Sequence, residues 1–300
     1  MSQIVIKTEN LTKYYGKNLG IENLNFEIRK GELFGFLGPN GAGKSTTIRL
    51  LLNLLKPSSG QAYLFGKEIE KHYCNLFRRI GNVPGELKLY EELTGNQFLH
   101  YMNSFNGKMS ILRDELLHAF QLKDQDLDKK IKHYSRGMKQ KLGIIQAMQE
   151  KPDLLIMDEP SEGLDPLNRN ILYDYLLRFK EEGMTIFFSS HNLSEVEKIS
   201  DHVGLVKEGK FIALEPIAEL KKKMVRRLEI EFFEDIKPEM IKHTSFNLIS
   251  HHGKHFVYTV HGKIDPIIKE IAKYRIKNLV FPEPSLEEMF MTFYQAEKKS

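Results

Sequence analysis

A loop at residues 38–46 constrains this chain more than any other feature. It fits the pattern G-x-x-x-x-G-K-[ST], with Lys44 and Ser45 at the fixed places. An apolar run at residues 33–37 predicts a buried strand before the loop, and helical spacing follows at residues 46–55. Glycines let backbone N–H groups turn inward without a Cβ clash, so this arrangement predicts a phosphate site. The loop consists of Gly38, Pro39, Asn40, Gly41, Ala42, Gly43, Lys44, Ser45 and Thr46.

Two side chains of this loop should complete the phosphate site. The N-terminus of the following helix contributes at most about 2 kcal/mol, which is too little to hold a triphosphate. We therefore expect Lys44 to supply a positive charge and the Ser45 hydroxyl to bind Mg²⁺. A glycine-rich turn with an incidental lysine is the alternative, and the flanking strand and helix argue against it.

Polar residues also follow two other predicted strands. Asp158 and Glu159 come directly after an apolar run at residues 154–157, and His191 follows a run at residues 184–188. Asp158 can hold a metal ion, and Glu159 can accept a proton from an attacking water molecule. Ligands gather at the carboxyl ends of parallel strands, which favours a functional over a structural role for these residues. A solvated acidic turn and a structural histidine are the alternatives.

Length, composition and charge limit the classes of protein to which this chain can belong. A length of 300 residues and 41% hydrophobic content suit one large domain or two smaller ones. The net charge of +4 indicates no general polyanion binding, so we expect no nucleic-acid partner. No apolar run approaches the ~18 residues that cross a bilayer, no signal peptide is recognised, and Cys74 has no cysteine to pair with. We expect a cytosolic protein that reaches a membrane only through a partner.

The remaining periodicity predicts an α/β fold. Tyr14 and Tyr15 follow a first predicted strand, where a ring could stack on an adenine or simply end the strand. The stretch 134–138 reads Tyr-Ser-Arg-Gly-Met, in which Ser135 suits a helix N-cap and Gly137 permits close backbone approach. Further strands are predicted at residues 4–11, 24–28, 61–65, 80–84, 202–206 and 210–214, and helices at 94–120 in two pieces, 138–150 and 166–180.

Composition shifts after Leu214. A basic stretch at residues 221–227 suits a solvated helix end better than a contact with acidic headgroups. We interpret His251, His252 and His255 as part of a surface hairpin and not as a metal site. The predicted elements from residue 228 to residue 281 have the order βαββαβ, which is typical of a ferredoxin-like module. They are strands at 228–233, 246–250, 255–260 and 277–281 and helices at 238–242 and 265–274, and a last helix follows at 285–295.

These motifs, in this order, resemble the nucleotide-binding subunit of an ATP-binding cassette (ABC) transporter over residues 4–214. The resemblance makes residues 38–46 the Walker A loop and Tyr15 the adenine-stacking aromatic. Asp158 would be the Walker B aspartate that binds Mg²⁺ with Ser45, and Glu159 the catalytic glutamate. It further implies a P-loop NTPase core with an N-terminal antiparallel β layer and a helical subdomain at about 86–150. The cassette would span residues 1–215, and a small α+β domain would span residues 216–300.

The same resemblance assigns the remaining motif positions. Ser135, Arg136 and Gly137 match the signature motif, Asp165 the D-loop aspartate, and His191 the switch histidine. The signature reads Tyr-Ser-Arg-Gly-Met where the family's usual form is Leu-Ser-Gly-Gly-Gln, a variant similar to that of exporter-type ATPases.

A second departure lies after the strand at residues 80–84. The family usually has a glutamine there that reaches toward Mg²⁺, and this chain has Gly85 followed by Glu86. Glycine has no side chain to offer, and Glu86 is a candidate substitute. We expect ATP binding despite this departure. The missing glutamine bears instead on how ATP hydrolysis is coupled to transport.

The resemblance also implies partners. Two subunits would sandwich two ATP molecules head to tail, with the signature serine of one closing over the γ-phosphate held by the other. The subunit pair, homodimeric or heterodimeric, would power export through separate transmembrane subunits at the cytoplasmic face of the membrane. The C-terminal segment resembles those of exporter-type (ABC-2) systems. A non-transport ABC ATPase acting on ribosomes or DNA is the alternative, and an ATP sensor without hydrolysis is a third.

Overall fold

The computed structural model describes residues 3–105, 107–223, 226–238, 241, 246–260 and 264–282. The chain divides into two compact units between Ile217 and Ala218. The first unit contains a four-stranded and a six-stranded sheet, and the second contains another four-stranded sheet. Within the described residues, no helix combines the length and the hydrophobicity needed to cross a membrane.

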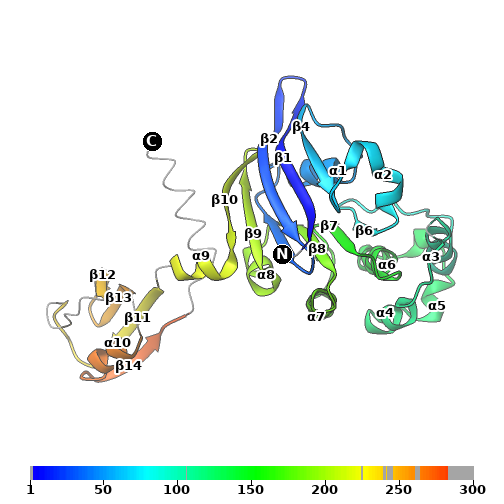
Figure 1. Ribbon diagram of the computed structural model, residues 1–300. Helices are drawn as coiled ribbons and strands as arrows, with labels where there is room; N and C mark the ends of the chain where they lie inside the picture. Colours follow the sequence, from blue (N-terminus) through cyan, green and yellow to red (C-terminus); the bar gives the residue numbers. More distant parts are fainter. Residues whose placement is uncertain are drawn as a thin grey trace. The chain divides into compact units, whose positions relative to one another are not determined.

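An antiparallel sheet begins the first unit (Figure 1). Its first two strands are longer than the apolar pattern predicted, because they continue to a tight turn at Gly16, whose φ is +60°. Tyr15 pairs with Asn18 in this hairpin, so it lies on the strand and not after it. The order is β2-β1-β4-β5, with β1 at Ile4–Tyr15, β2 at Asn18–Arg29, β4 at Ser59–Leu64 and β5 at Lys67–Glu68.

The second sheet is parallel except for one edge strand. Every residue of β3, β7 and β8 is buried, which explains why apolar residues make up most of β3 and β7 and the centre of β8. Register pairs Leu37 with Ser190 and Asp158 with Ser189, so three carboxyl ends meet at one edge. The order is β10-β9-β3-β8-β7-β6, with β3 at Leu33–Leu37, β6 at Ile80–Val83, β7 at Leu154–Asp158, β8 at Thr185–Ser190, β9 at His202–Lys207 and β10 at Lys210–Pro216.

Helices cover both faces of the parallel sheet (Figure 1). The antiparallel sheet and α1 (Lys44–Leu51) cover one face, and three helices cover the other: α6 (Arg136–Met148), α7 (Pro166–Glu181) and α8 (Leu193–Ile199). Helix α2 (Ile69–Phe77) follows β5. A helical group precedes α6 and consists of α3 (Gly95–Ser104), α4 (Arg113–Ala119), α5 (Asp124–Leu127) and the 3₁₀ turn η1 (Ile131–His133).

Helix α1 ends four residues before the periodicity predicted. Asn53 adopts a left-handed conformation with φ of +53°, and the Leu54 N–H donates back to the Arg49 carbonyl at 2.8 Å. Such a turn ends a helix because it satisfies a free carbonyl of the last turn.

Aromatic rings join the two sheets of the first unit. Phe26 of β2 stacks on Phe34 of β3 with ring centroids 5.7 Å apart, and Phe34 stacks on Phe187 of β8 at 5.8 Å. All three side chains are buried. This packing holds the antiparallel layer over β3 and thereby sets where β1 and Tyr15 lie relative to the loop that follows β3.

The second unit contains an antiparallel sheet in the order β12-β13-β11-β14. β13 and β14 both run antiparallel to β11, which lies between them, and α10 connects them, so they form a split βαβ unit. The predicted helices at 238–242 and 285–295 lie wholly or mostly outside the described residues, so the ferredoxin-like assignment stays a prediction. The elements are α9 at Ile217–Lys223, which spans the unit boundary, β11 at Arg226–Phe232, β12 at Phe246–His252, β13 at His255–Val260, α10 at Ile264–Ile271 and β14 at Ile276–Val280.

Candidate nucleotide site

The glycines of the loop are required by its close packing. Gly43 has φ of +106°, and a Cβ there would lie 2.6 Å from the Ile21 side chain. A Cβ on Gly38 would lie 2.3 Å from the Val206 carbonyl oxygen. No larger residue fits these two positions without moving the backbone. The loop can therefore pass between β2 and β9 only because both positions are glycine.

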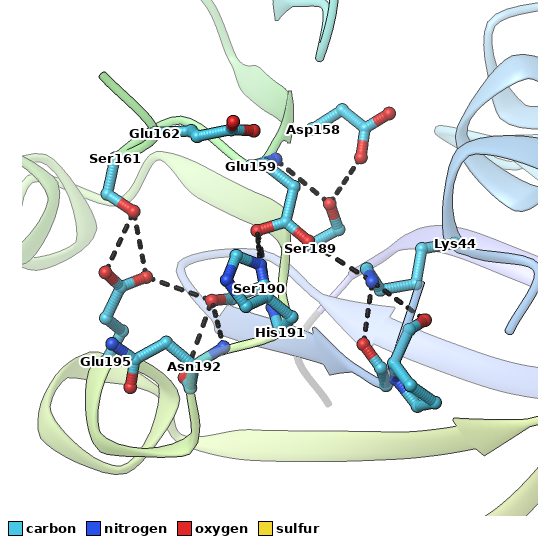
Figure 2. A network of polar contacts seen from close by, with 12 residues as sticks. Lys44, Asp158, Glu159, Ser161, Glu162, Ser189, Ser190, His191, Asn192 and Glu195 are labelled. Carbon is cyan, nitrogen blue, oxygen red and sulfur yellow. Dashed lines mark hydrogen bonds and ion pairs between the residues drawn. The ribbon is translucent and has the colours of Figure 1, made fainter. Parts of the chain in front are cut away.

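Lys44 is held inside the curve of this loop. Its side chain is 6% exposed, and Nζ donates to the carbonyl oxygens of Gly38 at 2.7 Å and Pro39 at 3.2 Å. Nζ also lies 3.2 Å from Oε1 of Glu159 (Figure 2). A buried ammonium group is stable only when it is paired. These contacts place the ammonium group at the centre of the site.

A cavity of about 300 Å³ lies over the loop, a size that suits a small-molecule ligand. Tyr15 stands at this cavity with 43% of its surface exposed and its hydroxyl 3.3 Å from Thr46 Oγ1, so its ring is accessible to a ligand. The residues that line the cavity are Tyr15, Leu19, Gly20, Asn40, Gly41, Gly43, Lys44, Ser45, Thr46, Asp158 and Glu159. No sequence motif predicted that Leu19 and Gly20 line this cavity.

Asp158 is oriented by a neighbouring strand. Ser189 Oγ donates to Asp158 Oδ1 at 2.5 Å and accepts from the Glu159 N–H at 3.0 Å. A Cβ on Gly85 would lie 3.0 Å from Asp158 Oδ2, so the glycine leaves space beside that second oxygen. Carboxylate and hydroxyl oxygens are the ligands that Mg²⁺ prefers. Asp158 and Ser45, which line one cavity, therefore fit the metal expected there.

Glu159 contacts Lys44 and His191. Its Oε2 lies 2.9 Å from His191 Nδ1, and its Oε1 faces Lys44 (Figure 2). Its backbone has φ of +50°, a conformation that is uncommon for residues other than glycine and often found at functional sites. The histidine side chain is 56% exposed. The structure thus brings the predicted acidic residue and the predicted histidine into direct contact.

The signature residues lie outside the nucleotide cavity of their own chain. Ser135 caps α6, its Oγ accepting from the Met138 N–H at 3.2 Å, and Arg136 forms an ion pair with Glu162. A separate cavity of about 380 Å³ lies here, lined by Gly85, Glu86, Leu87, Tyr134, Arg136, Lys139, Gln140 and Glu162. One chain therefore does not assemble the nucleotide cavity and the signature motif into one site.

The candidate substitute for the family's glutamine lies outside the cavity that Ser45 and Asp158 line. The Glu86 side chain is 82% exposed and lies 3.6 Å from Lys88 Nζ. Gly85, in contrast, is the residue that adjoins Asp158. In this conformation position 85 provides space and no side chain, and Glu86 does not reach the nucleotide cavity.

Asp165 has a structural role within one chain. It is the N-cap of α7, and its carboxylate accepts from the Asn168 backbone N–H at 2.9 Å and from Asn168 Nδ2 at 2.6 Å. These hydrogen bonds hold the pKa of Asp165 below its usual value, because they favour the charged form. The carboxylate therefore fixes the start of α7 after the loop that carries Glu159.

Comparisons with known proteins identify the family of this chain. The family model "ABC transporter" matches residues 21–162. The chain is 37% identical to the bacitracin transport ATP-binding protein BcrA of Bacillus licheniformis, over 96% of each chain. This chain belongs to the ATP-binding subunits of ABC transporters. It is also 39% identical to the lantibiotic transport ATP-binding protein SrtF of Streptococcus pyogenes, over 69% of this chain and 89% of the relative.

Solved structures confirm the fold of this ABC subunit. The ATP-binding subunit of an ABC transporter is 30% identical, with a TM-score of 0.68 over 73% of this chain and 92% of the other. A dimeric bacterial ABC transporter cassette is 25% identical, with a TM-score of 0.66 over 71% and 98%. The predicted fold class and the predicted ATPase subunit of an ABC transporter are confirmed, which sets aside the non-transport alternative.

Ser189 and Glu195, which support the ABC site, were also missed by motif reasoning. Ser189 orients Asp158, and Glu195 of α8 accepts hydrogen bonds from serines on two segments that flank the site. The available signal for Ser189 was its position, because a polar pair precedes His191 at the end of an apolar strand. Nothing in the local sequence distinguished Glu195 from an ordinary helix-surface glutamate.

Proposed function

We propose that this chain is the ATPase subunit of a membrane exporter for antibiotic compounds, acting at the cytoplasmic face of the membrane. The observation that carries the ATPase role is the single cavity in which Lys44, Asp158 and Glu159 meet. The substrate class rests on relatives whose names specify bacitracin, linearmycin resistance in Bacillus subtilis, and lantibiotics. The separately encoded transmembrane subunits would choose the compound.

ATP binding in this proposal uses the loop, the tyrosine and the metal ligands. The loop N–H groups and Lys44 would hold the phosphates, and the exposed ring of Tyr15 would stack on the adenine. Ser45 and Asp158 would hold Mg²⁺, which when bound neutralises charge on the phosphate oxygens. Gly85 leaves space beside Asp158 that water can occupy.

Hydrolysis would begin when Lys44 exchanges its contact with Glu159 for contacts with phosphate oxygens. The ammonium group now lies 3.2 Å from Glu159 Oε1, and incoming phosphate oxygens would compete for it. Loss of that contact would leave Oε1 free to accept a proton from the attacking water. His191, already 2.9 Å from Oε2, would hold the other side of the carboxylate and contact the γ-phosphate. ATP binding would in this way free Glu159 to act as the general base for hydrolysis.

A second subunit would complete the site. The Ser135 Oγ accepts from a backbone N–H, so its own proton is available for a phosphate oxygen of a facing subunit. Arg136 and Gly137 open the same helix and would approach that phosphate with it. The partner would be a second copy of this chain or a related cassette, and Asp165 would lie near the junction.

An exposed aromatic cluster of the helical group is our candidate contact for the membrane subunit. Tyr90, Tyr101 and Phe105 are each more than 40% exposed, and their rings meet edge to face at 5.4 and 4.9 Å. Adjacent exposed apolar side chains mark interaction sites more often than isolated ones do. The cluster would couple movement of this group to the membrane subunit.

The dimer can be tested through Ser135. In a Glu159→Gln background, ATP should convert the protein to a dimer, measured by size-exclusion chromatography with light scattering. Ser135→Asp should abolish that dimer, because aspartate can still cap α6 but its carboxylate has no proton to donate and repels the phosphate. Ser104→Asp, at an exposed position of α3, is the matched control and should dimerise. Dimerisation of the Ser135→Asp variant would contradict the proposed contact.

The substrate class can be tested in cells. Deletion of the gene for this chain should lower the minimal inhibitory concentration of bacitracin or a lantibiotic, and the wild-type gene should restore it. The Glu159→Gln gene should not, because export would stop without hydrolysis. Unchanged susceptibility to these compounds on deletion would contradict the antibiotic class and leave the ATPase assignment standing.

A further inference from the structure

A second polar cluster lies beside the catalytic pair, centred on Glu195 of α8 (Figure 2). The side chain is 7% exposed. Ser161 Oγ lies 2.9 Å from both carboxylate oxygens, and Ser190 Oγ lies 2.9 Å from Oε2. The Arg169 Nε of α7 lies 3.8 Å from Oε1. One buried carboxylate thus joins a loop, a strand end and a neighbouring helix.

This arrangement is not what stability alone would favour. A buried carboxylate must replace its lost hydration with hydrogen bonds, and well-packed apolar side chains often serve stability as well. Burial, together with the adjacent Glu195, raises the pKa of Tyr173, so this neighbouring phenol stays protonated. The positive charge that faces the carboxylate is the Arg169 guanidinium, 3.8 Å away. A buried carboxylate with two serine partners therefore calls for a role other than packing.

The positions of the two serines indicate that role. Ser161 lies two residues after Glu159, and Ser190 directly precedes His191. The sheet holds Asp158 and Ser189 in register, but Glu159 and His191 lie beyond that last pair. Past the sheet, the two segments are joined by the Glu159–His191 contact and by Glu195. Glu195 is thus placed to set the distance between the general base and the switch histidine.

We propose that Glu195 is a positioning residue for ATP hydrolysis, holding the loop after Glu159 against the segment that carries His191. This inference rests on the roles proposed above for those two residues. Glu195 is not among the residues that line the nucleotide cavity, and its partners Ser161, Ser190 and Arg169 lie outside residues 38–46. Its loss should therefore affect the turnover step and not the binding of ATP.

The test separates these two quantities. Glu195→Ala should lower kcat by about 10²-fold, the effect expected when a remote change shifts reacting groups by about 1 Å. The Kd for Mg-ATP, measured by calorimetry, should change less than about twofold, because the binding loop is untouched. Glu195→Gln keeps an acceptor oxygen for the serines and should recover part of kcat. Glu195→Met fills a similar volume without that oxygen and should not recover kcat, which a role in packing alone would not predict.

Two further variants keep the test decisive. The double change Ser161→Ala and Ser190→Ala leaves Glu195 in place, removes its two donors and should also lower kcat, so a poorly folded Glu195→Ala protein would not end the experiment. Glu181→Gln removes an exposed carboxylate from α7 and should behave as wild type.

The outcomes discriminate between the inference and its premise. A kcat within about twofold of wild type in the folded serine variant, or losses of kcat and ATP affinity in the same proportion, would overturn the positioning role. Glu159→Gln is measured in parallel. If that variant turns over normally, the proposed catalytic site has failed, whereas if it is inactive and the Glu195 and serine variants are normal, only the present inference has failed.

Discussion

Replacing Glu159 with glutamine should lower the rate of ATP hydrolysis by roughly 10²–10⁴-fold, the usual contribution of a general base. Glutamine has the same shape but cannot take a proton from water at neutral pH. The change also removes the negative charge that now lies 3.2 Å from Lys44 Nζ. ATP affinity should therefore be kept or increased, because Lys44 no longer has to leave a carboxylate before it meets the phosphates.

Two measurements check this expectation. Steady-state release of phosphate gives kcat, and calorimetry with Mg-ATP gives the affinity. Glu181→Gln, on the exposed end of α7, is the matched control and should keep wild-type values in both assays. Normal turnover in the Glu159→Gln protein would remove Glu159 from the catalytic role and return attention to the other acidic residue of the cavity, Asp158.

Replacing Lys44 with alanine should abolish tight nucleotide binding. A hydrogen bond to a charged group contributes about 1.5–3 kcal/mol, which corresponds to roughly a ten- to hundredfold rise in Kd. Lys44 Nζ also bonds the carbonyl oxygens of Gly38 and Pro39, so alanine would leave both without that donor and loosen the loop. The expected loss of affinity is therefore at least that of one charged contact.

Calorimetry with Mg-ATP measures this loss directly. Lys56→Ala removes an exposed lysine just beyond the C-terminal end of the helix that Lys44 begins, and its Kd should equal that of the wild type. A thermal unfolding curve for each variant shows whether the protein is folded. An unchanged affinity in a folded Lys44→Ala protein would refute the phosphate-binding role of the loop.

Much of the fold could be predicted because its signals are local. Continuous apolar runs such as 154–157 belong to strands buried on both faces, and Ser135 does cap the helix that follows it. Boundaries were less predictable. The first hairpin extends to Tyr15 through backbone pairing that apolar spacing does not encode, and α1 ends where Asn53 turns left-handed.

The phosphate loop, the acidic strand end and the family were all readable from residue order, because each is a short motif whose chemistry depends on neighbours in the chain. Which side chains meet was decided by tertiary packing. Lys44 contacts Glu159, and Glu159 contacts His191, because parallel strands far apart in sequence end at one edge of a sheet. Glu195 joins Ser161 to Ser190 only once α8 folds back onto that edge, so no spacing along the chain could have revealed it.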